Sequence, residues 1–306
     1  MTLTHIDSQQ VAAALTPKDA VYALRAVLEQ GFDPSTDLPR TSGEITNGSF
    51  LLMPSNSPTA FGIKLISVPG ETADPSVPSV NGLYALFDGA TLQPTCTIDG
   101  VALTNLRTPA VSLAGIAHLI TESSEPLNVV IVGTGQQGRA HAATVKSVVE
   151  GIRDVNITFQ SRTQPDELEN WLKVGSDEAK AAVQEAELIL TTTTSPEPVL
   201  DNDDVGSDAI IVAVGSHSPD ARELPGELMG RAQVIMEEEG AAFREAGDII
   251  QAVDEGALNK DSIASFAEVV RGDVKLNRES PVIFKFTGMP WEDLVLAEAI
   301  FAKHQA

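Results

Sequence analysis

The stretch NVVIVGTGQQGRAHAATV, residues 128–145, joins an apolar strand to a helical segment through a turn with three glycines. Gly133, Gly135 and Gly138 follow the pattern G-x-G-x-x-G. The first glycine permits a tight turn, the second lets the backbone approach a pyrophosphate, and the third lets the helix pack on the strand. The N–H groups and dipole of the helix start then favour a phosphate. The turn predicts a dinucleotide site with contacts from Gly133, Thr134, Gly135, Gln136, Gln137 and Gly138.

The chain around this turn alternates apolar segments with helical ones between about residues 126 and 281. Alternating strands and helices predict an α/β domain with a Rossmann-type, doubly wound parallel sheet. We expect strands within residues 128–133, 155–163, 186–194, 209–217 and 232–240, and helices within residues 140–151 and 166–174.

The end of the second predicted strand distinguishes between the two nicotinamide dinucleotides. A carboxylate there would accept hydrogen bonds from the ribose hydroxyls of NAD, but this chain has Gln160 followed by Ser161, Arg162 and Thr163. A cation between two hydroxyls suits the 2′-phosphate of NADP. We therefore expect NADP(H) to be preferred and NAD(H) to be possible. The alternative is a solvated Arg162 and an enzyme that uses either cofactor.

Two later segments, TTTTSPEP at 191–198 and AVGSHSPD at 213–220, lie at the ends of predicted strands. Ligands of open α/β sheets bind at the carboxyl ends of the strands. We therefore expect Thr192, Thr193 and Gly215 to contact the ribose or the amide of the nicotinamide.

The composition limits the partners and the compartment. The formal charge is −23, from 43 acids and 20 bases, and such a surface repels nucleic acid and anionic lipid. Cys96 is the single cysteine, so it can form neither an internal disulfide nor a zinc site, and we expect no metal. A sequence without a signal-peptide pattern or an apolar run of about 18 residues predicts a cytoplasmic protein with no membrane partner.

In so acidic a protein, an anionic ligand requires the few bases to be gathered. Residues 1–120 contain five bases. Lys18 and Arg25 lie on a predicted amphipathic helix with Thr16 as its N-cap, and we expect both to be solvated. Arg40 lies in a loop beside a proline and alone indicates little.

Lys64 and Arg107 have less usual neighbours. Lys64 lies in the apolar strand FGIKLISVPG, residues 61–70, where it must reach solvent, an ion-pair partner or a ligand. The alternative is an outward-facing position on a half-exposed strand. Thr108 and Pro109 have the types of an N-cap and a first helical residue, which would place Arg107 just before a helix start. Because the helix dipole is positive there, an arginine is unfavourable unless it shares an anion, and we expect Arg107 to bind a ligand.

These elements together resemble the ornithine cyclodeaminase and mu-crystallin family. The resemblance covers most of the chain and is carried by IK at 63–64, LFDG at 86–89, LRT at 106–108, GTGQQG at 133–138 and PDAREL at 219–224. It implies an α+β domain for substrate binding and dimerisation, built from both chain ends, over residues 1–121 and 284–306. It also implies a dinucleotide-binding Rossmann domain over residues 122–283, and a homodimer.

Family members generally hold the carboxylate of the substrate with bases at the positions of Arg40, Lys64 and Arg107. The resemblance therefore implies this role for the three residues, in agreement with the scarcity of bases. A guanidinium presents a planar fork to two carboxylate oxygens, and a lysine adds a mobile charge.

Ornithine cyclodeaminases of the family carry two further carboxylates that grip the amino groups of ornithine. The corresponding positions here hold Leu51 and His217, with Asp220 close to the second. A diamine thus lacks its partners, whereas a hydrophobe at Leu51 suits a compact ring with one carboxylate. The segment GSHSPDARELP, residues 215–225, resembles the bacterial ketimine reductases. These enzymes reduce 1-pyrroline-2-carboxylate to proline and 1-piperideine-2-carboxylate to pipecolate, which would place the protein in proline metabolism.

We therefore expect hydride transfer from NAD(P)H to the C=N carbon of a cyclic imino acid, with both partners held in a near-attack pose. Lys64 or a bound water is the candidate acid for the imine nitrogen, and His217 or Asp220 are further candidates. The alternatives are an ornithine cyclodeaminase, an L-alanine dehydrogenase, and a protein that binds NADPH and a small ligand without turnover.

Overall fold

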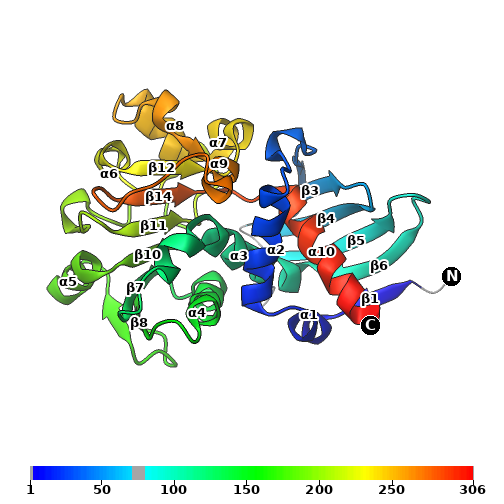
Figure 1. The fold of residues 1–306 in the computed structure, drawn as a ribbon, viewed down its shortest axis with the longest axis horizontal. Coiled ribbons are helices and arrows are strands. Elements are labelled where there is room, and N and C mark those ends of the chain that lie inside the picture. Colours follow the sequence, from blue (N-terminus) through cyan, green and yellow to red (C-terminus); the bar gives the residue numbers. More distant parts are fainter. Residues whose placement is uncertain (1–2, 71–79, 306) are drawn as a thin grey trace. The chain divides into compact units, whose positions relative to one another are not determined.

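The computed structural model describes residues 3–70 and 80–305, and the chain forms two compact units (Figure 1). The first unit combines residues 1–111 with 288–306, and the second spans 112–287. These limits differ from the predicted ones at 121 and 283. Helix α3 (Gly100–Thr121) runs through the first limit, and a cut at 283 would divide strand β14 (Val282–Lys285), which belongs to the sheet of the second unit.

The first unit has a six-stranded sheet in the order β1-β6-β5-β4-β3-β2. Strand β1 pairs parallel with β6, and the other neighbours are antiparallel. Helix α10 packs on β3, β4 and β5 and also contacts α1 and α2 (Figure 1). The elements are β1 (Thr4–Ile6), α1 (Ser8–Ala14), α2 (Pro17–Glu29), β2 (Thr41–Ile45), β3 (Gly48–Asn56), β4 (Ala60–Pro69), β5 (Asn81–Asp88), β6 (Pro94–Asp99) and α10 (Pro290–Gln305).

The register of this sheet places Lys64 in its core. Met53 pairs with Lys64, Lys64 with Tyr84, and Tyr84 with Ile98, so all four side chains lie in one row on one face. All four are buried, and Lys64 is 1% exposed. The alternative of an outward-facing Lys64 is therefore wrong, and of the possibilities left open for its side chain, solvent is excluded and an ion-pair partner or a ligand remains.

The opposite face of the same sheet is apolar and open. Leu52 pairs with Leu65, and Leu65 with Leu83, in a row of three leucines. Leu65 and Leu83 are 40% and 41% exposed. Hydrophobic side chains thus lie on both faces of β4, and only one of these faces is covered by α10.

The second unit has an eight-stranded sheet in which every pairing is parallel, in the order β13-β12-β14-β11-β10-β7-β8-β9. The predicted doubly wound α/β fold is confirmed. Its elements are β7 (Leu127–Val132), α4 (Gln136–Val149), β8 (Val155–Ser161), β9 (Trp171–Lys173), α5 (Asp177–Glu185), β10 (Leu188–Thr191), β11 (Ile210–Ala213), α6 (Gly226–Arg231), β12 (Gln233–Met236), α7 (Glu239–Glu245), α8 (Gly247–Asp254), β13 (Ala264–Ser265), α9 (Phe266–Arg271) and β14.

Two local predictions are wrong. Residues 166–174 do not form a helix, because Trp171–Lys173 instead pair with β8 at the sheet edge, where pairing overrides helix propensity. The long helix α3 does not start at Thr108 but at Gly100, because the Asp99 carboxylate accepts hydrogen bonds from the N–H groups of residues 101 and 102. Pro109 lies inside this helix. The predicted helix with Thr16 as its N-cap is confirmed as α2.

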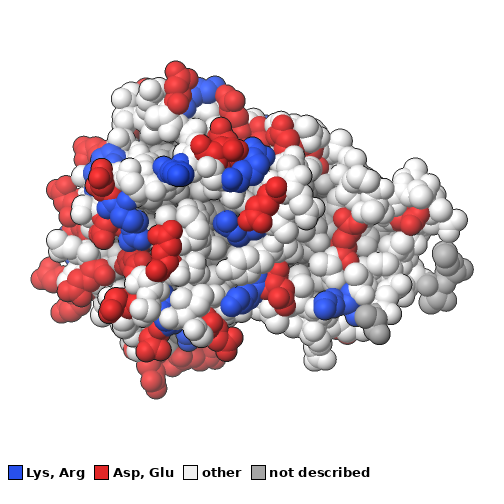
Figure 2. Space-filling view, in the orientation of Figure 1, with Lys and Arg blue, Asp and Glu red and all other residues white. Residues whose placement is uncertain are grey.

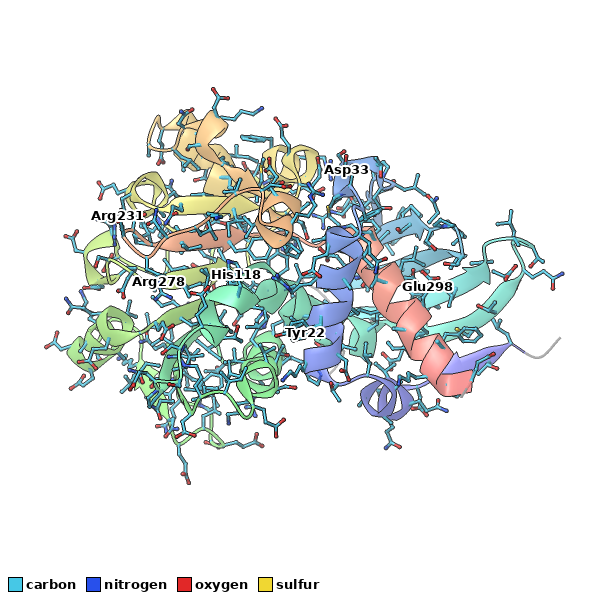
Figure 3. The ribbon with its side chains drawn as sticks, in the orientation of Figure 1. Tyr22, Asp33, His118, Arg231, Arg278 and Glu298 are labelled. Atoms are coloured by element: carbon cyan, nitrogen blue, oxygen red, sulfur yellow. The ribbon has the colours of Figure 1, made fainter. Side chains whose placement is uncertain are left out.

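Side chains also fasten the ends of the elements. In the first unit, Glu298 lies on α10 (Figure 3). Its carboxylate accepts hydrogen bonds from Ser57 at 3.2 Å and Thr59 at 2.7 Å, which ties the helix to the β3–β4 turn. In the second unit, Arg231 at the end of α6 donates to Asn202 Oδ1 at 2.7 Å and to the Val205 carbonyl at 2.9 Å. Within residues 3–70 and 80–305, none of the helices combines the length and the apolar character that crossing a bilayer requires.

Candidate active site

In the glycine turn of the second unit, each glycine has the backbone geometry that its predicted steric role requires. Gly133 has φ +115°, a conformation that residues with a side chain rarely adopt. A side-chain carbon on Gly138 would collide with the carbonyl oxygen of Gly133, so the start of α4 packs directly on the turn. Gly135 is the N-cap of α4, and a side-chain carbon there would meet nothing within 4 Å. The backbone at Gly135 therefore faces open space, as close approach of a pyrophosphate requires.

A cavity of about 700 Å³ opens at the carboxyl ends of β7, β8 and β10. Its volume, and the glycine turn that contributes Gly133 and Thr134 to its wall, fit a dinucleotide. Its wall includes six of the residues predicted to bind the cofactor, which are Gly133, Thr134, Ser161, Arg162, Thr192 and Thr193. The other predicted contacts are not part of the wall. Gly135, Gln136, Gln137, Gly138 and Thr163 follow wall residues closely along the chain, whereas Gly215 lies in the loop after β11.

The end of β8 brings a cation to this cavity. Ser161 Oγ donates to the Thr163 carbonyl at 2.7 Å and accepts from Trp171 Nε1 at 2.8 Å, so the hydroxyl holds the loop together. Arg162 is exposed and lines the cavity. The two wall acids, Asp201 and Asp204, both lie within ion-pair distance of Lys180 Nζ, at 3.7 and 3.5 Å. Among the described residues no acid pairs with Arg162, so its charge is available to a ligand.

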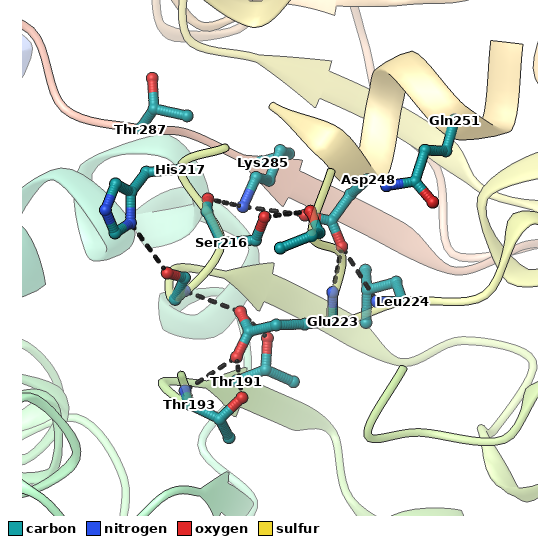
Figure 4. A network of polar contacts seen from close by, with 12 residues as sticks. Thr191, Thr193, Ser216, His217, Glu223, Leu224, Asp248, Gln251, Lys285 and Thr287 are labelled. Atoms are coloured by element: carbon teal, nitrogen blue, oxygen red, sulfur yellow. Dashed lines mark hydrogen bonds and ion pairs between the residues drawn. The ribbon is translucent and has the colours of Figure 1, made fainter. Parts of the chain in front are cut away.

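The predicted residues after β11 lie near the surface. His217 and Asp220 are exposed, and His217 Nδ1 lies 3.2 Å from the Gly215 carbonyl oxygen. Figure 4 shows His217 on the loop that follows β11, together with a buried carboxylate, Glu223, that the sequence analysis did not single out. Glu223 is part of the PDAREL segment, so the signal for it was present in the motif.

In the first unit, Lys64 forms a buried ion pair with the start of α10. Lys64 Nζ lies 2.9 Å from Asp293 Oδ1 and 2.7 Å from Oδ2, and both side chains are at most 1% exposed. Burial, followed by the charge of Arg107, lowers the pKa of Lys64 to about 8, and Asp293 and Glu292 oppose this change.

Arg107 joins the same group of charges from α3. Its Nε lies 3.4 Å from Asp293 Oδ1, and its Nη1 lies 3.5 Å from Glu292 Oε2. Gly288 has φ +89°, and a side-chain carbon there would collide with the guanidinium of Arg107. The structure thus brings Lys64 and Arg107 together, and a single carboxylate, that of Asp293, contacts both.

The loop before Arg40 is fastened to the same helix end. Asp37 Oδ2 accepts a hydrogen bond from the Trp291 N–H at 2.7 Å, and its Oδ1 accepts from Ser55 Oγ at 2.8 Å. Burial raises the pKa of Asp37, and these hydrogen bonds oppose that rise. Arg40 follows at the end of this loop, half-buried, just before β2.

Three acids of this site were not predicted, namely Asp37, Glu292 and Asp293. Their signal is weak in the sequence, because acids are common in this chain and no motif marks Glu292 and Asp293 among them. Both lie in the first turn of α10, where the helix dipole favours negative charge. Leu51 is half-buried on β3, on the same face as Met53 and Lys64, so this face carries apolar side chains next to Lys64.

Comparisons with known proteins agree on one family. The profile described as "Ornithine cyclodeaminase/mu-crystallin family" matches residues 8–306. A Δ(1)-pyrroline-2-carboxylate reductase of Bacillus cereus is 30% identical over 301 residues, which cover 92% of this chain and 90% of that protein. The ketimine reductase mu-crystallin of Macropus fuliginosus is 31% identical over 252 residues, 81% of this chain and 77% of that protein. The structure of Thermococcus litoralis Δ(1)-pyrroline-2-carboxylate reductase with NADH and L-proline matches with a TM-score of 0.85 and 24% identity, over 99% of this chain and 98% of that one.

The lowered pKa of Lys64 predicts a pH dependence of stability. The folded protein gives up this proton at about pH 8, whereas an unfolded chain keeps it up to about pH 10.5. Between these values unfolding takes up a proton, so the free energy of unfolding gains up to roughly 3 kcal/mol from Lys64 as the pH rises. Urea unfolding at several pH values measures this gain. Lys64→Met and Lys64→Arg, neither of which titrates in this window, should both lack it, and a slope equal to that of the wild type in both would contradict the assignment.

Proposed function

The chain belongs to the ornithine cyclodeaminase/mu-crystallin family, and on that premise we propose that it is an NAD(P)H-dependent reductase of cyclic ketimine acids. Its substrates are 1-pyrroline-2-carboxylate, reduced to proline, and 1-piperideine-2-carboxylate, reduced to pipecolate. The observation that supports this most directly is the pair of buried bases, Lys64 and Arg107, held together by one carboxylate on the covered face of an apolar sheet.

The bases bind the substrate by its carboxylate. Lys64, Arg107 and Arg40 supply three positive charges, of which the first two are already fixed in position by Glu292 and Asp293. A base that is held in place before binding loses less side-chain entropy when the substrate arrives. The neighbouring Leu51 and Met53 are apolar and suit the methylene groups of a five- or six-membered ring.

Reduction of the C=N bond requires a hydride at carbon and a proton at nitrogen. The reduced nicotinamide supplies the hydride when it is bound. Among the candidate acids, Lys64 is buried with its pKa lowered to about 8, which is close to the pH at which a general acid is effective. His217 and Asp220 are exposed. We therefore assign proton donation to Lys64 Nζ.

A reductase accounts for the site better than an ornithine cyclodeaminase does. The second amino group of ornithine would need an acid near Leu51, but Leu51 pairs with Ser42 and Ile66 in the register, and neither residue is acidic. Substrates with one carboxylate and no second charge match these neighbours.

The open apolar face of the first sheet supports a homodimer. The row Leu52, Leu65 and Leu83 leaves two leucines about 40% exposed on adjacent strands, and exposed apolar surface of this kind marks protein interfaces. A second copy of the chain would cover it with the same face, as two-fold symmetric dimers do.

An assay with NADPH or NADH and three substrates tests the reaction. We expect cofactor oxidation with 1-pyrroline-2-carboxylate and 1-piperideine-2-carboxylate, and little with pyruvate plus ammonia. Lys64→Met should lower kcat by about 100-fold or more if it supplies the proton. Release of ammonia from ornithine without net cofactor use would instead identify a cyclodeaminase. NADPH binding without any turnover would identify a binding protein.

Arg162 determines the preference for NADPH. We expect Arg162→Gln to raise the KM for NADPH by about tenfold or more, because a charged hydrogen bond to the 2′-phosphate is lost. The KM for NADH and the kcat with either cofactor should stay close to wild type. Equal effects on both cofactors would show that Arg162 does not contact a 2′-phosphate.

The dimer is tested at Leu65. Leu65→Asp places a charge in the apolar row, and we expect a monomer by sedimentation or light scattering. Ile152→Asp replaces a leucine-sized residue that is 38% exposed in the second unit, and it should stay dimeric. A wild-type monomer, or a Leu65→Asp dimer as stable as the wild type, would contradict the proposed interface.

A further inference from the structure

The carboxylate of Glu223 gathers the carboxyl ends of two neighbouring strands. It is completely buried and accepts four hydrogen bonds (Figure 4). Oε1 accepts from the Thr193 N–H and from Thr193 Oγ1, both at 2.8 Å. Oε2 accepts from Thr191 Oγ1 at 2.8 Å and from the Gly215 N–H at 2.7 Å. One side chain thereby fixes the ends of β10 and β11 to each other.

A second buried group holds Glu223 in place. Asp248 Oδ1 accepts from the N–H groups of Glu223 at 2.7 Å and Leu224 at 2.9 Å. Asp248 Oδ2 lies 2.9 Å from Lys285 Nζ, which also donates to the Ser216 carbonyl at 2.6 Å. These contacts form a closed ring. It runs from Glu223 to Gly215, along the chain to Ser216, then through Lys285 and Asp248 back to Glu223. Asp248 and Lys285 are completely buried, as Glu223 is.

This ring lies behind the cavity at the strand ends. Thr193 belongs to the cavity wall, whereas Glu223 does not. Gly215 lies in the loop that carries His217 and Asp220. In an open parallel sheet, the ends of β10 and β11 are where the reactive part of a dinucleotide lies when its pyrophosphate occupies the glycine turn on β7. Glu223 therefore contacts the segments that border the nicotinamide without contacting the cavity itself.

We propose that Glu223 is a positioning residue that sets the location of the nicotinamide through Thr193 and Gly215. This inference rests on the proposed function, because it assumes hydride transfer at this cavity. Small displacements of a reacting group lower the rate far more than they lower the affinity of the rest of the cofactor. Glu223 thus acts on the rate, whereas Arg162, at the adenosine end, acts on cofactor affinity.

Glu223→Gln tests this role with little change of shape. Each oxygen of Glu223 accepts one backbone N–H, from Thr193 or from Gly215. A glutamine has one oxygen and one NH₂ group, so whichever way the amide turns, one of these N–H groups faces another donor. The threonine hydroxyls can reverse their roles, but a backbone N–H cannot.

The matched control is Glu187→Gln in the same unit. Glu187 pairs with the buried Arg153 at 2.7 Å, just before the amino end of β10. Both variants should lower the thermal midpoint of unfolding. We expect only Glu223→Gln to lower kcat, by about tenfold or more, with the Kd for NADPH within about threefold of wild type. Glu187→Gln should keep the wild-type kcat.

Thr191→Val provides a milder variant if Glu223→Gln does not fold. It removes one hydrogen bond to Glu223 from a side chain outside the cavity wall, and kcat should fall in the same direction. A Glu223→Gln protein that is destabilised like Glu187→Gln but keeps its kcat would overturn the proposal. If Glu223→Gln does not fold, a Thr191→Val protein that keeps the wild-type kcat would also overturn the proposal.

A readout without turnover separates this proposal from the proposed function. The fluorescence emission of bound NADPH reports the surroundings of its nicotinamide. We expect this emission to change in Glu223→Gln and to stay as in the wild type in Glu187→Gln. A wild type that binds NADPH but reduces neither imine would contradict the proposed function. The emission still tests the positioning role in that case, because an unchanged emission spectrum in Glu223→Gln would overturn that role.

Discussion

The first unit depends on the neutralisation of two buried bases by the start of its last helix. A charged lysine in an apolar sheet is costly unless an opposite charge lies against it. Asp293 meets this need for Lys64 and also contacts Arg107, and Glu292 adds a second contact to Arg107. Because both acids come from the end of the chain, the C-terminal segment must return to the N-terminal sheet. This charge requirement thus adds to the packing of α10 on β3, β4 and β5 in joining both chain ends in one unit.

The second unit solves a similar problem with carboxylates and backbone N–H groups. Parallel strands that end at a ligand-binding edge leave N–H groups without a strand partner, and these groups need acceptors when they are buried. Glu223 and Asp248 supply such acceptors for Thr193, Gly215 and Leu224. A buried acid with several such donors is stable without a base of its own, which explains how an acidic chain can keep Glu223 in its core.

Local chemistry in the sequence predicted much of the fold. The glycine turn and its flanking strand were identified because each glycine has a distinct steric role, and the parallel sheet followed from the alternation of apolar strands with helices. The predicted helix at 166–174 was wrong because strand pairing at the sheet edge decides the structure of that segment. The start of α3 was misplaced because Pro109 has the type of a first helical residue, whereas the cap is Asp99.

The burial of Lys64 could not be predicted, because both faces of β4 carry apolar residues. Leu65 is 40% exposed and Lys64 is 1% exposed, which is the reverse of what hydrophobicity alone indicates. Only the partner, Asp293, reveals which face is covered, and it lies 229 residues away along the chain. Contacts at such separation leave no periodic pattern in a single sequence. The resemblance to a family identified the bases but gave no information about the acids that hold them.

The few buried bases of this acidic chain also have a structural role, in addition to the binding role proposed for two of them. Acidic side chains are prominent on the visible surface of the second unit (Figure 2). Among the described residues, the buried bases are Lys64, Arg107, Arg153 and Lys285, and each lies within ion-pair distance of an acid. Arg153 also donates to the carbonyls of residues 120 and 126, so it joins separate segments in the way a metal or a disulfide would. In an acidic protein, many segments carry an acid that can form an ion pair with a buried base. A buried base therefore joins segments that are distant along the chain. Lys64 and Arg107 combine this structural task with the one proposed for them in binding, because a base already fixed by the fold is also a base already oriented for a substrate carboxylate.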